Sequence, residues 1–259
     1  MWLRKSPRTK TVARRSSSQR PGQPAKGFNR SRRLQLESLE QRAMLTDYTM
    51  SATQNGSADT FRLVKSGSNV LGYVNESLNQ TMPIASLGRI TINGSSDNDT
   101  LTIDSSGGAF SVPDGVAFNA GSGTDTLVAQ SQTSNGDVMS VTPTTAGAGS
   151  VGYVAADGTE GNLPTVTYSS LENITLTGQS GDGDTFAVDG SAGSDAFVVN
   201  EGGSAGSGTV TASLNGGAYS LPTITFRRGV EAMRPMIVCT RSGTEAPGSA
   251  VCAKAGDSM

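Results

Sequence analysis

Short runs of β-forming residues recur along the chain, for example the alternating Leu-Thr-Ile at 101–103 and the apolar Phe-Val-Val at 197–199. Alternation with a period of two places apolar side chains on one face of a β-strand. Each run follows a glycine-rich turn that ends in Asp-Thr or Asp-Ala. The copies of this phrase carry Asp59, Asp99, Asp125, Asp184 and Asp195. Turn and strand form one recurring unit, and such internal repetition predicts an extended, repetitive β architecture.

Longer segments repeat as well. Gly72-Tyr-Val followed by residues 83–92 matches Gly152-Tyr-Val followed by residues 163–176, and a truncated third copy covers residues 221–231. Insertions separate the copies. The stretches 131–150 and 200–218 are rich in Gly, Ser, Thr and Asn, and this composition predicts loops.

The composition favours a thin core. The chain holds 33 glycines, and only 5% of its residues are aromatic. Stacked repeats bury a narrow apolar layer between neighbouring coils, so they need few aromatic side chains. We therefore expect residues 46–226 to form an all-β domain, an irregular parallel β-helix or related β-solenoid. The alternative is a β-sandwich array, which also suits short strands between glycine turns.

The N-terminal region differs from this β domain. Residues 1–33 hold 11 of the 20 Lys and Arg and no acid, and they are predicted to be a disordered basic arm. Residues 34–45 are predicted to form a short amphipathic helix. The remainder of the chain, 34–259, has 9 basic and 22 acidic residues, a net charge near −13. Residues 227–259 lack the repeated phrase and are expected to be an irregular tail, either a cap or an interrupted repeat.

The segment Leu39-Glu40-Gln41-Arg42-Ala43-Met44-Leu45 follows the basic arm. It resembles the LEPR-xLL motif of exported and cell-surface proteins of planctomycete bacteria, with Leu39, Glu40, Arg42, Met44 and Leu45 at the motif positions. The resemblance implies export to the cell surface or the medium. The alternatives are a fortuitous amphipathic turn behind a basic tail, or a nucleic-acid-binding arm. No aromatic or base-reading module accompanies the charges, so no nucleic-acid partner is expected.

Several classes of site lack their residues. The chain has no histidine and only two cysteines, which excludes Ser-His-Asp and Cys-His catalysis and the usual zinc sites. No apolar stretch approaches the roughly 20 residues of a membrane-spanning helix. Asp182, Asp184, Asp189 and Asp195 are dense enough for a pair of glycosidase carboxylates. However, no Lys, Arg, Trp or Tyr occurs between residues 169 and 218 to hold a sugar, so we expect no enzyme.

Two explanations compete for the repeated phrase. Glycine supplies positive φ and aspartate caps its own turn, which needs no ligand. Alternatively, Gly121-Ser-Gly-Thr-Asp125-Thr-Leu resembles the nonapeptide repeat of RTX proteins, which implies a calcium site. In this interpretation the candidate ligands are Asp182, Asp184 and Asp195, with Asp125 as a weaker, separate site. The tandem nine-residue spacing of RTX repeats is missing.

The remaining expectations concern the tail and the function. Cys239 and Cys252 enclose a short loop and could form a disulfide, with two unpaired thiols as the alternative. We expect an exported, non-enzymatic structural or adhesive protein, whose partners would be cell-envelope components or extracellular glycans. The alternatives are a calcium-dependent binding module and a carbohydrate-active enzyme.

Overall fold

The computed structural model describes residues 44–131, 137–155, 163–179, 184–204 and 206–227, together with strands at 237–240 and 251–254. The chain divides into two units, Met1–Gln41 and Arg42–Met259, and the description below concerns the second. The described part is all-β, which confirms the predicted class. The basic arm and most of the predicted helix 34–45 lie outside it. Only Met44 and Leu45 are described, and both are exposed and non-helical.

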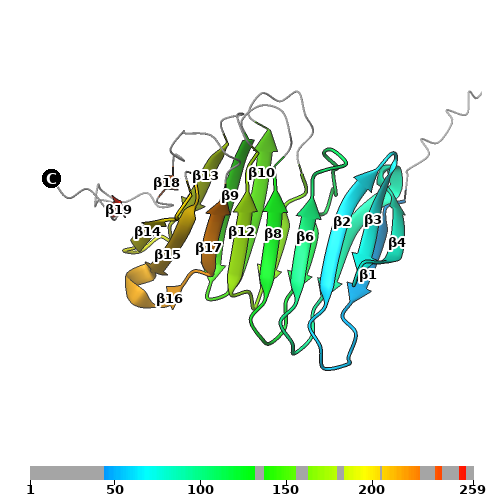
Figure 1. The fold of residues 1–259 in the computed structure, drawn as a ribbon, viewed down its shortest axis with the longest axis horizontal. Coiled ribbons are helices and arrows are strands. Elements are labelled where there is room, and N and C mark those ends of the chain that lie inside the picture. Colours follow the sequence, from blue (N-terminus) through cyan, green and yellow to red (C-terminus); the bar gives the residue numbers. More distant parts are fainter. Residues whose placement is uncertain are drawn as a thin grey trace, which may run out of the picture. The chain divides into compact units, whose positions relative to one another are not determined.

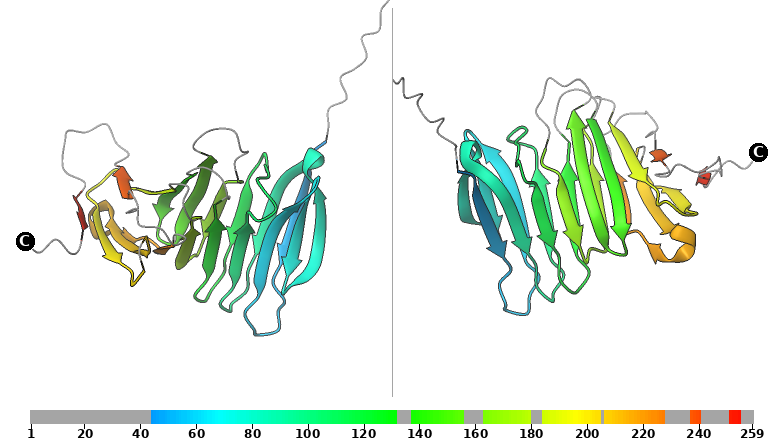
Figure 2. Two further views of the ribbon diagram at one scale, coloured as in Figure 1. Left: turned by 45° about the horizontal axis from the view of Figure 1, so that its top comes forward. Right: turned by 180° about the vertical axis from the view of Figure 1, so that it is seen from behind.

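The strands form two sheets (Figures 1 and 2). Sheet A contains, in spatial order, β1 (Thr46–Ser51), β5 (Leu87–Asn93), β7 (Val116–Asn119), β11 (Val166–Ser169), β10 (Ala148–Ala155), β9 (Asp137–Thr145), β13 (Thr185–Asp189) and β18 (Ile237–Thr240). Sheet B contains β4 (Ser77–Pro83), β3 (Asn69–Val74), β2 (Thr60–Ser66), β6 (Thr100–Asp104), β8 (Thr126–Gln130), β12 (Asn173–Thr177), β17 (Thr223–Arg227), β15 (Gly208–Leu214), β14 (Ala196–Glu201) and β19 (Val251–Lys254). Strand β16 (Tyr219–Ser220) pairs with β15.

The chain passes repeatedly from sheet A to sheet B. Strand β1 is followed by β2, β5 by β6, β7 by β8 and β11 by β12. Neighbouring strands from successive passes pair in parallel and in register, so that Thr60, Thr100 and Thr126 are direct neighbours in sheet B. We call one strand of each sheet, with its connecting turn, a coil. Residues at the same place in successive coils therefore lie side by side.

Three antiparallel meanders interrupt this parallel pattern. They are β2–β3–β4, β9–β10–β11 and β14–β15–β17. Asp59 and Asp195 directly precede the first strands of two of them, and Asp137 begins that of the third. The long sequence repeats begin in these meanders, and the first two copies continue into the parallel strands β5 and β12. The meanders alternate between the sheets. The third strands of the first and last meanders, β4 and β17, belong to sheet B, and the third strand of the middle meander, β11, belongs to sheet A.

The prediction of loops at 131–150 and 200–218 is wrong for much of both stretches. The first contains β9 and the start of β10, and the second contains β15. In both, short apolar side chains alternate with Ser and Thr, and Val141 and Val210 point inward and are buried. The small residues that suggested loops are tolerated because hairpin partners complete the hydrogen bonding of these strands.

The core lies between the two sheets and is mainly aliphatic. The largest fully buried side chains include Phe61, Phe118, Phe186 and Phe226, and the ring centroids of Phe186 and Phe226 are 5.8 Å apart. Most other core positions carry Leu, Ile or Val. This agrees with the thin core expected from the low aromatic content.

The tail at 227–259, expected to be irregular, contains the short strands β18 and β19. The backbone of Cys239 lies in β18 opposite Val188 of sheet A, whereas Cys252 lies in β19 opposite Phe197 of sheet B. The side chains of both cysteines lie outside the described part of the chain. The disulfide therefore stays a prediction.

Candidate functional site

The aspartates of the repeated phrase stand at the starts of strands. Asp59, Asp99 and Asp125 directly precede the neighbouring parallel strands β2, β6 and β8. They therefore lie in a row at the end of sheet B where these strands begin. Asp184 precedes β13 in sheet A. All four side chains are buried, with at most 2% of their surface exposed. Buried carboxylates need hydrogen-bond donors, and the donors here are mainly main-chain N–H groups.

The row in sheet B is connected from coil to coil. The main-chain N–H of Asp59 donates to Oδ1 of Asp99 at 2.8 Å, and that of Asp99 donates to Oδ1 of Asp125 at 2.7 Å. The N–H of Asp125 donates to Oε2 of Glu172 at 2.8 Å. Glu172 directly precedes β12, so it takes the place of the aspartate in the fourth coil. We call these four residues the carboxylate row.

Asp59 and Asp99 also cap the turns that lead into their own strands. Oδ2 of Asp99 accepts from the N–H of Ser95 at 2.5 Å and from its hydroxyl at 2.9 Å. Oδ2 of Asp59 accepts from the N–H of Thr53 at 2.8 Å. One carboxylate therefore satisfies donors of its own turn and of the preceding coil. This is the turn chemistry predicted for the phrase, extended by a bond between coils.

The same arrangement occurs once in sheet A. Oδ1 of Asp184 accepts from the N–H of Asp137 at 2.9 Å, and these two residues stand at the starts of the paired strands β13 and β9. Oδ2 of Asp184 accepts from the N–H of Gln179 at 2.7 Å and from the hydroxyl of Ser131 at 3.1 Å. Asp184 thus also joins its own turn to a neighbouring strand.

Asp195 is half-buried and serves the third meander. Its carboxylate accepts from the N–H and hydroxyl of Ser191 at 2.8 and 2.5 Å. It also accepts from the N–H of Asn215 at 3.0 Å, in the turn that follows β15. Asp195 therefore caps the turn that precedes β14 and also binds the turn that follows β15, the antiparallel partner of β14.

The candidate calcium ligands do not share one place in the described fold. Asp184 precedes a strand of sheet A and Asp195 a strand of sheet B, whereas Asp182 lies outside the described residues. Within the described ranges no group of three or more Asp, Glu or Cys side chains is arranged to hold a metal ion. The calcium site stays a prediction.

Glycines of the phrase allow the turns to stack closely. A Cβ at Gly121, where φ is 108°, would lie 2.0 Å from the carbonyl oxygen of Ser95, and one at Gly94 would lie 2.0 Å from that of Ala120. The N–H of Ser122 donates to the same Ser95 carbonyl at 3.0 Å. These turns touch backbone to backbone, which only glycine permits.

Asp125 has an unusual electrostatic environment. The pKa of its carboxyl is raised to about 6, mainly by burial; the hydrogen bond from the N–H of Asp99 opposes this rise, and the charges of Glu172 and Asp99 contribute to it. Its Oδ2 has no hydrogen-bond partner within the described part of the chain. Asp125 therefore takes up a proton more readily than an ordinary aspartate does.

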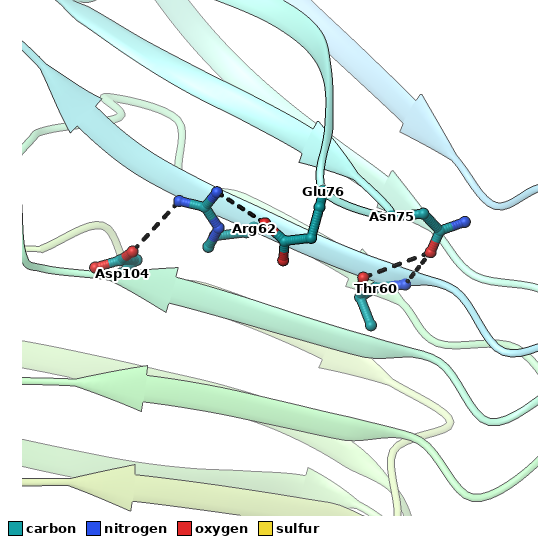
Figure 3. A network of polar contacts seen from close by, with 5 residues as sticks. All are labelled: Thr60, Arg62, Asn75, Glu76 and Asp104. Atoms are coloured by element: carbon teal, nitrogen blue, oxygen red, sulfur yellow. Dashed lines mark hydrogen bonds and ion pairs between the residues drawn. The ribbon is translucent and has the colours of Figure 1, made fainter.

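A polar network fixes the first meander to the next coil (Figure 3). Arg62 lies 3.1 Å from a carboxylate oxygen of Glu76 and 3.5 Å from one of Asp104, and its guanidinium stacks on the ring of Tyr73. Asn75 and Glu76 form the two-residue turn between β3 and β4, with φ values of 50° and 60°. Positive φ at both positions is typical of a type I′ hairpin turn.

An open pocket lies elsewhere, lined by residues 109–112 and 163–165. Phe110, Val112, Leu163 and Pro164 contribute much of its lining, and none of its lining residues is titratable. Its lining includes the hydroxyls of Ser111 and Thr165, but none of the lining residues is an acid or base that could activate a nucleophile. No described helix is long and apolar enough to cross a membrane.

Sequence reasoning identified the aspartates but missed Glu172 and Asp137. Glu172 follows Ser-Ser-Leu rather than a glycine turn, and its signal is its place directly before the alternating run at 173–177. Of the export motif, Leu39, Glu40 and Arg42 lie outside the described residues.

Comparison of the chain with protein-family models, curated proteins and solved structures finds no match.

Proposed function

We propose that this chain is an exported, non-enzymatic structural or adhesive protein of the cell surface, built as a β-solenoid. One observation carries the proposal. The buried carboxylates of the repeated phrase accept hydrogen bonds from main-chain N–H groups of neighbouring coils, as between Asp59 and Asp99. The most distinctive residues of the sequence thus serve the scaffold.

The strand connections support a solenoid over a sandwich array. Successive passes alternate between the sheets, and β2, β6, β8, β12 and β17 pair in parallel and in register. Sandwiches are usually built from antiparallel strands with Greek-key connections. The three meanders are then irregular insertions in a stack of coils.

The chemistry of the described acids supports a non-enzymatic role. A general acid or nucleophile must face its substrate. The carboxylates of Asp59, Asp99 and Asp184 are buried and accept two or more hydrogen bonds each. Export is supported by the resemblance of residues 39–45 to the LEPR-xLL motif and by the basic arm that precedes them.

Fractionation of the native host tests the localisation. Cells would express the full chain or a form lacking residues 1–45. We expect the full chain at the cell surface or in the medium and the shortened form in the cytoplasm. Recovery of both forms in the cytoplasm would contradict export.

Calcium dependence is tested separately by melting the purified chain in calcium and in chelator. A calcium-induced rise in melting temperature that Asp195→Asn abolishes would support the binding-module alternative. Identical melting curves would leave the aspartates as turn residues.

A further inference from the structure

The outer face of sheet B carries a regular array of small, uncharged side chains. Four neighbouring parallel strands, β6, β8, β12 and β17, each contribute two outward positions. The first row consists of Thr100, Thr126, Asn173 and Thr223, and the second of Thr102, Val128, Thr175 and Thr225. We call these eight residues the threonine grid.

The register of the strands makes the grid a lattice. Thr100 lies opposite Thr126, Thr126 opposite Asn173 and Asn173 opposite Thr223, and the second row follows the same pairing. The residues between the two rows, such as Leu101 and Ile174, point inward and are fully buried. All eight grid residues are half-buried, because each side chain lies beside the outward side chains of the neighbouring strands. Figure 1 shows these four strands side by side and nearly parallel.

The spacing of the grid follows from strand geometry. Neighbouring strands lie about 4.8 Å apart, and alternate residues along a parallel strand lie about 6.6 Å apart. Threonine is branched at Cβ, so its χ1 angle is restricted and the hydroxyls and methyls keep fixed positions. The grid therefore presents hydroxyl and methyl groups at regular intervals in two dimensions.

The charge of the grid restricts what it can bind. None of its eight residues is charged, although residues 34–259 carry 22 acidic and 9 basic side chains. Charges lie at its border, with Arg62 beside Thr102 on the neighbouring strand β2 and with Asp104 and Arg227 in the next row. The grid also has no aromatic ring on which a sugar could stack. It suits an uncharged partner that is flat and periodic.

We propose that the threonine grid binds the surface of ice. Hexagonal ice presents flat layers of hydrogen-bonding oxygen atoms whose repeat distances are of the same order as those of the grid. The methyl groups order the water around them, and the hydroxyls accept and donate hydrogen bonds to that ordered water. The inference rests on the proposed adhesive function and names the surface that is bound.

The test uses the purified full chain and a slowly growing ice front. The fraction of protein incorporated into the ice is measured for the wild type, Thr175→Tyr and Thr91→Tyr. Thr175 lies within the grid, whereas Thr91 is a half-buried, outward threonine of the parallel strand β5 in sheet A. We expect Thr175→Tyr to lower incorporation about tenfold and Thr91→Tyr to leave it unchanged.

Several outcomes would overturn the proposal. They are exclusion of the wild type from ice, equal losses in both variants, or binding to microcrystalline cellulose or chitin without incorporation into ice. If Thr175→Tyr lowers the melting temperature, Thr102→Tyr replaces it; Thr102 lies in the same grid row on β6, with only β8 between the two strands. Because the assay needs no export, failure here leaves the fractionation result intact, and failure of export leaves this result intact.

Discussion

Oδ1 of Asp99 accepts a hydrogen bond of 2.8 Å from the main-chain N–H of Asp59, a residue 40 positions earlier in the chain. Both residues belong to copies of the same phrase, and the bond joins the turns of adjacent coils. A carboxylate can accept several N–H donors at once, so it satisfies its own turn and its neighbour together. The spacing between copies can vary, because the bond depends on stacking and not on sequence distance.

Removal of the Asp99 carboxylate is predicted to destabilise the fold strongly. Asp99→Ala leaves the N–H groups of Asp59 and Ser95 without their acceptor in a buried place. The expected loss in the free energy of unfolding is about 3 kcal/mol, because each buried donor left unsatisfied costs about 1–3 kcal/mol. Urea denaturation measures it.

Asp114→Ala is the control for this substitution. The side chain of Asp114 is exposed, and the expected change is within about 0.5 kcal/mol. Equal stability of Asp99→Ala and Asp114→Ala would show that the bond between coils contributes nothing.

The glycines of the turns are predicted to be as sensitive as the aspartates. Gly121→Ala places a Cβ against the Ser95 carbonyl at a positive φ, and it should cost about 3 kcal/mol through strain and backbone displacement. Gly108→Ala is the matched control, since Gly108 also has a positive φ, of 87°, and nothing lies within 4 Å of its Cβ position. Thermal melting of both variants compares them, and a Gly121→Ala protein as stable as the control would argue against close stacking of the turns.

Asp125 is predicted to make the fold less stable as the pH rises. Its pKa is about 6 in the folded chain against 3.8 for the ordinary group, so the folded state holds the proton more tightly. The contribution of Asp125 to stability is then fully present below pH 3.8 and is lost as the pH rises to about 6. The loss amounts to about 3 kcal/mol, at 1.36 kcal/mol for each pKa unit.

Asp125→Asn isolates this contribution. The amide oxygen can still accept the N–H of Asp99, while the charge beside Glu172 and Asp99 is gone. The variant should melt at a higher temperature than the wild type at pH 8, and the difference should shrink at pH 4. A constant difference across this range would mean that Asp125 does not titrate there.

The turn at Asn75 and Glu76 offers a stabilising substitution. Glu76 has a φ of 60°, a conformation that costs a residue with a Cβ about 1–2 kcal/mol. Glu76→Gly should raise the free energy of unfolding by about 1 kcal/mol, since the exposed ion pair with Arg62 contributes at most about 1 kcal/mol. Glu76→Gln, which keeps the strain and removes the charge, should not stabilise the protein.

The sequence was most informative where a glycine-aspartate turn met an alternating run. Residues 101–103 and 197–199 were predicted as strand and lie in β6 and β14. The turn chemistry of Asp59, Asp99 and Asp184 could be predicted, because a carboxylate caps its own turn through residues nearby in sequence. The all-β class followed from the same local patterns.

Contacts between distant residues could not be predicted in this way. The partner of the Asp125 N–H is Glu172, 47 residues away, and only the stacking of β8 on β12 brings them together. The sequence pattern predicts loops where β9 and β15 form, because small polar residues dilute the alternation of these strands. Their stability comes from hairpin partners, which a local pattern does not contain.

The hydrogen bonds of the carboxylate row join the coils of sheet B, and nuclear magnetic resonance can detect them directly. Scalar couplings across hydrogen bonds would be recorded between main-chain ¹⁵N and side-chain ¹³C carboxyl nuclei, with couplings between β6 and β8 as the internal reference. We predict couplings from the amide of Asp59 to the carboxyl carbon of Asp99, from Asp99 to Asp125 and from Asp125 to Glu172. Clear reference couplings with none of these three would contradict the account.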